Sequence, residues 1–213
     1  MAVGSLGEII VGLKGGVTQF TQVRNTFPLR RELTLPKPLL EIISRGLRDA
    51  EPDVRSNAAF ASGVLIENTE TDLAPQFVAL LTALQPFFTI PEHSAPAVYN
   101  ARDNAAGAVS RMIVKNSAAL PLDQVIAIIV SVLPLRFDTL ENRPVYTALF
   151  TLFRTQSQIL MPHIDQLLQA FAYVLLDASN EGDTTAETKA ELRALVEHLK
   201  TQIPEKVAAA GFQ

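Results

Sequence analysis

The chain has no cysteine, and only 19% of its 213 residues are charged. The lack of cysteine excludes disulfides, thiolate zinc sites and cysteine nucleophiles. Basic residues are few as well, with 18 Lys and Arg against 22 Asp and Glu, which gives a net charge of −4. A general nucleic-acid binder needs clustered basic side chains for its phosphate contacts. We therefore expect no direct nucleic-acid partner and favour basic proteins as partners.

Long apolar runs and targeting signals are also lacking. No run approaches the roughly 18 apolar residues that a membrane span needs. The longest candidate, residues 125–135, is interrupted by Ser131 and closed by Pro134. The first residues lack the basic region and the long apolar region of a secretory signal. We expect a protein of the cytoplasm or nucleus, with no membrane insertion.

Motifs for catalysis, metals and cofactors are absent too. His93, His163 and His198 lie about 35 or more residues apart and share no spacing that suits a metal site or a catalytic pair. The sequence contains no G-x-S-x-G motif and no Walker or dinucleotide-binding pattern. We predict that the chain is not an enzyme and holds no cofactor or metal.

One phrase of the sequence occurs twice. Residues 55–59 read Arg-Ser-Asn-Ala-Ala, and residues 102–106, which lie 47 positions later, read Arg-Asp-Asn-Ala-Ala. Self-similarity at 20 to 50 residues is typical of stacked repeats that cannot bury their apolar faces alone. Small residues follow both copies, as helices that approach closely require. We predict an all-α solenoid of about four to five antiparallel helix pairs, with an ordinary Ala-rich helical bundle as the alternative.

Apolar spacing and Pro or Gly breakers place the helices along the chain. The final helix spreads charge over much of its surface, as a terminal capping repeat needs, whereas the start of the chain is apolar. We therefore expect a C-terminal piece of a longer solenoid, over residues 1–203, with residues 204–213 as a C-terminal tail. The predicted helices are residues 2–14, 38–47, 52–68, 73–88, 96–115, 121–135, 140–156, 160–177 and 184–203.

The repeat resembles a known type. Asp49 precedes Val54-Arg55 at the spacing used in HEAT repeats, whose paired helices pack into an armadillo-like superhelix. Residues 57–68, 101–113 and 141–146 resemble the last HEAT repeats of the importin-β family of karyopherins. The resemblance covers nearly the whole chain except residues 23–37. It implies the C-terminal HEAT-repeat fragment of a much longer nuclear transport receptor.

The resemblance also implies partners. Such receptors carry basic cargo, such as histones and ribosomal proteins, through the nuclear pore between cytoplasm and nucleus. The family's Ran-GTP contacts lie mainly in N-terminal repeats, and its nucleoporin pockets lie between outer helices of more central repeats, so neither set maps onto residues of this chain. A HEAT-repeat scaffold that binds proteins without a transport role is the alternative.

Candidate cargo-binding residues lie on the second helices of the pairs, which line the concave face in this architecture. An acid, an amide and an aromatic ring together can hold a Lys ammonium by charge-assisted hydrogen bonds and cation–π contact. The alternative is a polar ladder between repeats, which keeps helices in register and caps their N-termini. The cargo candidates are Tyr99, Asn104, Glu141, Asn142 and Asn57, and the ladder candidates are Asp49, Arg55, Arg102 and Asp103. We expect Phe77, Phe87, Phe88, Phe150, Phe153 and Phe171 to be core residues, although they could line a nucleoporin pocket.

Residues 23–37 interrupt the repeat pattern. If they are deleted, residues 17–22 and 38–43 join into one HEAT first helix of ordinary length. The segment holds four of the 18 basic residues and one of the 22 acids. We interpret it as an insert, either a translated intron or a basic loop that contacts nucleic acid or an acidic partner.

Overall fold

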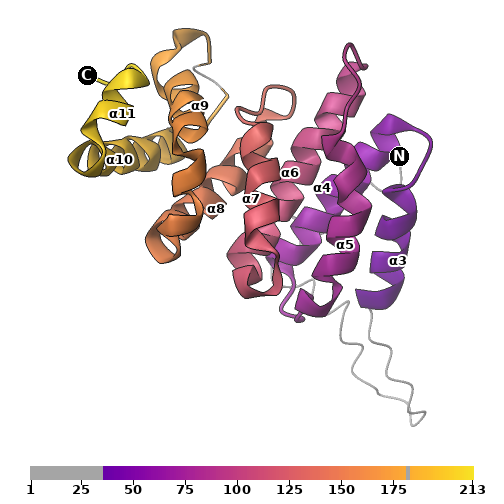
Figure 1. The fold of residues 1–213 in the computed structure, drawn as a ribbon. Coiled ribbons are helices and arrows are strands. Elements are labelled where there is room, and N and C mark those ends of the chain that lie inside the picture. Colours follow the sequence, from indigo (N-terminus) through magenta and orange to yellow (C-terminus); the bar gives the residue numbers. More distant parts are fainter. Residues whose placement is uncertain (1–35, 181–182) are drawn as a thin grey trace.

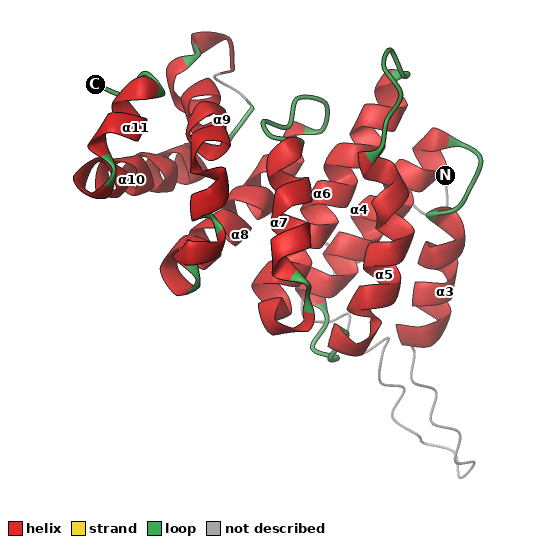
Figure 2. Cartoon of the chain, viewed as in Figure 1, coloured by secondary structure: helices red, strands yellow, loops and turns green. Residues whose placement is uncertain are grey.

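Figure 1 shows a computed structural model that describes residues 36–180 and 183–213 as a row of helices. Within those ranges the regular structure is entirely helical (Figure 2). The first pairs are α3 (Pro36–Gly46) with α4 (Pro52–Asn68) and α5 (Phe77–Leu84) with α6 (Pro96–Asn116). The later pairs are α7 (Leu122–Ser131) with α8 (Asn142–Thr155) and α9 (Ile164–Leu176) with α10 (Ala186–Gln202). A short last helix, α11, spans Pro204–Ala209.

The four pairs form the predicted all-α solenoid. In Figure 1, α3, α5 and α7 lie in front of α4 and α6, and the chain proceeds from one end of the row to the other. The second helices pack on one another, α4 on α6 and α6 on α8. The sequence therefore predicted both the helix pairs and the stacking of their second members.

The centre of the stack is α6. Every residue from Asp103 to Ile113 is buried, because α4 and α8 cover its sides and the first helices cover the rest. Small residues make this packing possible. A Cβ on Gly63 of α4 would lie 2.9 Å from Cα of Ala108 on α6, so the two backbones already touch. This confirms that the small residues after each repeated phrase serve close helix approach.

Helix starts and stops follow the local sequence. Pro52 and Pro96 open α4 and α6 at first-turn positions, where their missing N–H groups need no partner. Thr185 caps α10 by accepting a hydrogen bond from the backbone N–H of Thr188 at 3.2 Å. These helices begin within two residues of the predicted positions.

The C-terminal stretch differs from the expected tail. Residues 204–213 contain α11, and the side chains of Val207 and Phe212 are buried against the preceding helices. Lys206 also pairs with Asp165 of α9 at 2.7 Å. Pro204 ends one helix and starts another, so the chain turns back onto the stack.

One stretch is more apolar than the sequence analysis allowed. Residues Ser157–Leu176 have the length and mean hydropathy, 1.3, of a membrane span. A core helix can have the same length and composition, and α9 buries Ile164, Leu167 and Phe171 against its neighbours. The predicted helix at residues 2–14 and positions 23–35 of the proposed insert lie outside the described residues, whereas Pro36 and Lys37 begin α3.

Candidate functional site

Polar side chains join the second helices at two levels of the stack. At the first level Asp103, near the start of α6, is completely buried. One of its oxygens accepts from Arg102 at 2.8 Å, and the other accepts from the backbone N–H groups of Phe137 at 2.9 Å and Asp138 at 3.1 Å. Asp103 thereby holds the loop that leads into α8 against α6.

The two equivalent asparagines of the repeated phrase have different surroundings. Asn104 is 4% exposed, and its amide donates to Oγ of Ser56 and to the carboxylate of Asp138, both at 3.0 Å. Asn57 is half-buried on α4 and shares a helix face with Phe60 and Glu67. Burial and bonding therefore favour the ladder role for Asn104, whereas Asn57 remains accessible.

The second level centres on Arg111, which is 7% exposed. Its guanidinium donates to the carboxylate of Glu141 at 2.5 Å and to that of Glu67 at 2.8 Å. Glu67 in turn accepts from Arg143 of α8 at 3.0 Å. This chain of ion pairs, Glu141–Arg111–Glu67–Arg143, connects α4, α6 and α8.

Gly107 leaves the space for that ion pair. A Cβ at this position would lie 1.5 Å from Oε2 of Glu141, so any side chain would displace the carboxylate. The ion pair between Glu141 and Arg111 therefore requires glycine at position 107. With 1% of its surface exposed, Glu141 has no direct access to a cargo side chain, which favours the ladder role for it.

The pKa values of the ladder acids are shifted in opposite directions. Burial, which outweighs Arg111, raises the pKa of Glu141. Burial also raises the pKa of Asp138, and the nearby Asp103 charge adds to the effect despite the hydrogen bond from Asn104. Burial alone would raise the pKa of Glu67 too, but Arg111 and Arg143 together lower it. Glu67 is thus the ladder acid that is best kept ionised.

The predicted ladder residues Asp49 and Arg55 act locally. Arg55 donates to the backbone carbonyls of Asp49 and Ala50, both at 2.8 Å, and the Asp49 carboxylate accepts from the N–H of Glu51 at 3.0 Å. These bonds fix the turn between α3 and α4. They do not reach a neighbouring repeat within the described part of the chain.

Tyr99 lies at the start of α6, where the loop that leads into α8 packs on it. Its ring stacks on Phe137 with centroids 4.5 Å apart, and the Arg102 guanidinium lies 5.3 Å from the ring centroid. Half-buried between these neighbours, Tyr99 belongs to the same junction as Asp103.

A groove runs over the ion pairs on the face formed by α4, α6 and α8. We call it the Glu67 groove, and its volume is about 500 Å³. Its charged lining comprises three carboxylates, Glu67, Glu141 and Asp183, and two guanidiniums, Arg111 and Arg143. The remaining lining residues are Phe60, Val64, Asn68, Thr139, Leu140, Thr184 and Thr185.

Two polar side chains, Asn142 and Thr184, are buried near one end of the Glu67 groove. Asn142 donates its amide N–H to the backbone carbonyl of Asp183 at 3.1 Å. Oδ1 of Asn142 and Oγ1 of Thr184 are both buried, and neither has a hydrogen-bond partner among the residues described. Both atoms are enclosed, and Asn142 does not line the groove, so neither offers a contact to a ligand in this arrangement.

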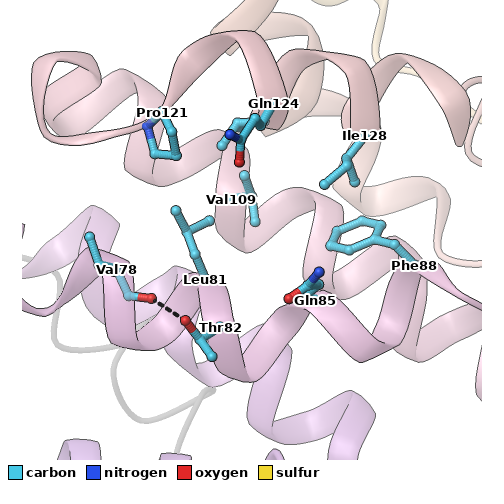
Figure 3. A pocket seen from close by; sticks show the side chains of 10 residues that line it. Val78, Leu81, Thr82, Gln85, Phe88, Val109, Pro121, Gln124 and Ile128 are labelled. Carbon is cyan, nitrogen blue, oxygen red and sulfur yellow. Dashed lines mark hydrogen bonds between the residues drawn. The ribbon is translucent and has the colours of Figure 1, made fainter.

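A second hollow lies on the opposite layer, between α5 and α7 (Figure 3). Its volume is about 250 Å³, and Val78, Leu81, Phe88 and Ile128 form its apolar walls, with Val109 of α6 at its base. We call it the α5–α7 pocket. Of the six phenylalanines expected in the core, only Phe88 lines it, while Phe77, Phe87, Phe150 and Phe171 are buried and Phe153 packs on the core.

The sequence analysis missed the residues at the centre of the ladder. Glu67, Arg111, Asp138 and Arg143 were not among its candidates. Arg111 carried a signal, because it is the one charge within the apolar and small residues 105–113, and a charge in a buried helix needs a partner. No group of three or more His, Cys, Asp or Glu side chains that could hold a metal occurs in the described part of the chain.

Comparison with known proteins gives homologues but no family model, since none matches the chain. Probable importin subunit beta-4 of Schizosaccharomyces pombe is 36% identical over 202 residues, which cover 95% of this chain and 17% of the relative. Importin-4 of Homo sapiens is 30% identical over 98% of this chain and 17% of its own length. Importin-4 of Mus musculus is 29% identical over 87% of this chain and 15% of its own. The chain therefore spans about a sixth of the length of these relatives.

Proposed function

We propose that this chain, a homologue of one stretch of the importin-4 proteins, is part of a nuclear transport receptor that binds basic cargo segments in the Glu67 groove. The observation that carries the proposal is 36% identity to an importin subunit over 95% of the chain. Histones and ribosomal proteins are the cargo class, and the receptor moves between cytoplasm and nucleus. The contacts with Ran-GTP belong to N-terminal repeats of the family and are not assigned to this chain.

The chemistry of the Glu67 groove supports a cationic occupant. Glu67 is the more exposed acid of the ion-pair chain, with 37% of its side chain accessible, and Arg143 beside it is 56% exposed. A cargo Lys can displace Arg143 from Glu67 at little cost, because exposed ion pairs contribute only about 0–1 kcal/mol. Asp183 then offers a second carboxylate for a basic side chain.

A Lys-rich peptide of about ten residues tests the groove directly. Fluorescence anisotropy with the whole chain should show salt-sensitive binding, because the contacts are charged and partly exposed. Glu67→Gln should weaken that binding about tenfold, the equivalent of about 1.4 kcal/mol. Glu205→Gln, at an exposed position on α11, removes the same charge far along the chain and should leave the affinity within about twofold of the native value.

The alternative, a HEAT scaffold without a transport role, gives a different result in this assay. It has no need of a basic partner, so the Lys-rich peptide would fail to bind the native chain. Equal losses of peptide affinity in Glu67→Gln and Glu205→Gln would also contradict binding in the Glu67 groove, since such losses would reflect only the net negative charge of the chain.

We further propose that the α5–α7 pocket takes a phenylalanine of a nucleoporin repeat. Its apolar walls, Leu81, Phe88 and Ile128, suit an aromatic ring, and the polar edges of Gln85 and Gln124 suit the backbone of the peptide that carries it (Figure 3). The pocket lies between first helices of successive pairs, which leaves it open to a partner when the opposite face holds cargo.

Val78→Asp tests this pocket, because Val78 lines it and is 63% exposed, so the variant should fold. Binding of a Phe-Gly repeat peptide, measured by NMR titration, should be lost in that variant. Val114→Asp is the matched control, since Val114 is 46% exposed but does not line the pocket. Equal binding by both variants would contradict the assignment.

A further inference from the structure

A polar pocket between α7 and α9 is used by neither proposed site. Its volume is about 370 Å³, and its polar lining comes from Ser131, Arg136, Gln166, Gln169 and Tyr173. We call it the Arg136 pocket. It contains no carboxylate, although the chain as a whole has a net charge of −4.

The loop that carries Arg136 is held on both sides. Leu135, the residue before it, is 1% exposed, and Phe137, the residue after it, stacks on Tyr99. The backbone N–H of Phe137 also donates to Asp103. Arg136 therefore projects from a fixed point of the backbone, and its entropic cost of binding is confined to its own side chain.

The side chain of Arg136 is itself oriented. Its guanidinium carbon lies 4.7 Å from the centroid of the Tyr173 ring, which is within the range of a cation–π contact. A guanidinium that contacts a ring through its carbon still has N–H groups that can meet a planar acceptor. No described carboxylate lies within ion-pair distance of Arg136.

The neighbours of Arg136 add further donors. Gln166 and Gln169 lie one turn apart on α9, and both are exposed. Ser131 donates its own hydroxyl proton to the carbonyl of Ile128 at 2.7 Å. The pocket thus combines a permanent positive charge with amide N–H groups, which is a composition that recognises carboxylates.

We propose that the Arg136 pocket binds an acidic segment of a partner protein, with one Glu or Asp carboxylate held by the guanidinium of Arg136 in a two-pronged contact. The amides of Gln166 and Gln169 bind the neighbouring carboxylate or carbonyl groups. The charge of the pocket is opposite to that of the Glu67 groove, so the chain has separate places for basic and acidic partners. This inference stands independently of transport.

A capped hexaglutamate peptide is the probe, titrated into the whole chain with isothermal calorimetry and with NMR of the arginine side-chain N–H groups. Binding should shift the Nε–H resonance of Arg136, and Arg136→Gln should weaken binding about tenfold, as expected when a charge-assisted hydrogen bond is lost. Arg136→Lys should also weaken it severalfold, because Lys keeps the charge but lacks the planar fork. Capped hexaglutamine should not bind.

Arg193→Gln is the matched control, because Arg193 is an exposed arginine on α10 with no ion pair among the described residues. It should bind hexaglutamate within about twofold of the native chain. Equal weakening by Arg136→Gln and Arg193→Gln would overturn the proposal, since general charge attraction would then explain the binding. A shift of the Arg136 resonance by inorganic phosphate but not by hexaglutamate would also overturn it, because the pocket would then be an anion site and not a docking site for an acidic segment.

Discussion

Gly107 is the residue at which one methyl group decides how two repeats meet. The Glu141 carboxylate occupies the space beside Gly107, and a Cβ added to this glycine would lie 1.5 Å from Oε2 of Glu141. Alanine is the better helix former by about 1 kcal/mol. The clash and the displaced buried ion pair together cost more than that gain, because breaking a buried pair alone costs about 3–5 kcal/mol.

We therefore expect Gly107→Ala to lower the free energy of unfolding by about 2–4 kcal/mol, measured by urea denaturation. Gly63→Ala is the comparison, since its Cβ would meet the Ala108 backbone at 2.9 Å, so α4 or α6 must shift to make room. It should also lower the free energy of unfolding. A Gly107→Ala variant as stable as the native chain would show that Glu141 does not occupy this space.

Asp138 gives a pH-dependent prediction. Burial and the Asp103 charge raise its pKa in the folded state, so the folded chain holds this proton more tightly than the unfolded chain does. The contribution of Asp138 to stability is therefore fully present below its unfolded pKa of about 4 and is lost as the pH rises through the folded pKa.

Asparagine at this position can still accept the bond from Asn104 but carries no charge. Relative to the native chain, the Asp138→Asn variant should thus be more stable at pH 7 than at pH 4, which means a larger free energy of unfolding at pH 7. Asp123→Asn, at an exposed position on α7, controls for the loss of one charge. A relative stability of Asp138→Asn that is the same at both pH values would contradict the burial of an ionised Asp138.

The repeated phrase also shows that a sequence repeat does not predict the burial of individual residues. Asn57 and Asn104 occupy equivalent positions in two repeats, and the pattern predicted equivalent roles. The loop that contains Asp138 covers Asn104, whereas the described structure places no such loop over Asn57. Periodicity identifies equivalent positions, but their burial depends on the length and course of the following loop.

At the scale of elements, Arg111 and Arg143 allow a buried ion pair between helices to be compared with an exposed one. Both donate to Glu67, but Arg111 is 7% exposed and also neutralises the buried Glu141, while Arg143 is 56% exposed. Arg111→Met should lower the free energy of unfolding by about 3–5 kcal/mol, because it leaves a buried carboxylate without its partner.

Arg143→Met is the matched control and should change stability by less than about 1 kcal/mol. Thermal or urea denaturation of both variants measures the difference. If the two substitutions cost the same, Arg111 is not the central cation of a ladder between α4, α6 and α8.

Helices were the most predictable elements. The proline at each start, the polar turns and the apolar spacing predicted α4 and α6 to within one residue at their ends. Helix α11 lies within residues 204–213, which the sequence pattern predicted as a C-terminal tail, although a proline at the first turn can start a helix. Val207 and Phe212 were the available signal, since two apolar residues in a short polar stretch suggest burial.

At the scale of the whole molecule, the stack of helix pairs followed from the repeat period together with the resemblance to HEAT repeats. The Glu67 groove did not. Its lining comes from α4, α6, residues 139–141, α8 and residues 183–185, which together span more than a hundred positions of the sequence. The angle between repeats decides which side chain covers which carboxylate, and this angle cannot be predicted from a single sequence.

The two proposed binding surfaces differ in the sign of their charge. The Glu67 groove has an excess of carboxylates, and the Arg136 pocket has a guanidinium without a carboxylate. If both proposals hold, the basic and the acidic segment bind at separate places, so neither peptide should compete with the other for the chain.

The most direct measurement of the central claim is an NMR titration of the isotope-labelled chain with the Lys-rich peptide. The account predicts that shifts concentrate on the Glu67 groove, at Phe60, Glu67, Leu140, Arg143 and Asp183, and that they disappear at high salt. Shifts confined to the α5–α7 face, or no shifts at all, would contradict the claim that this groove binds basic cargo.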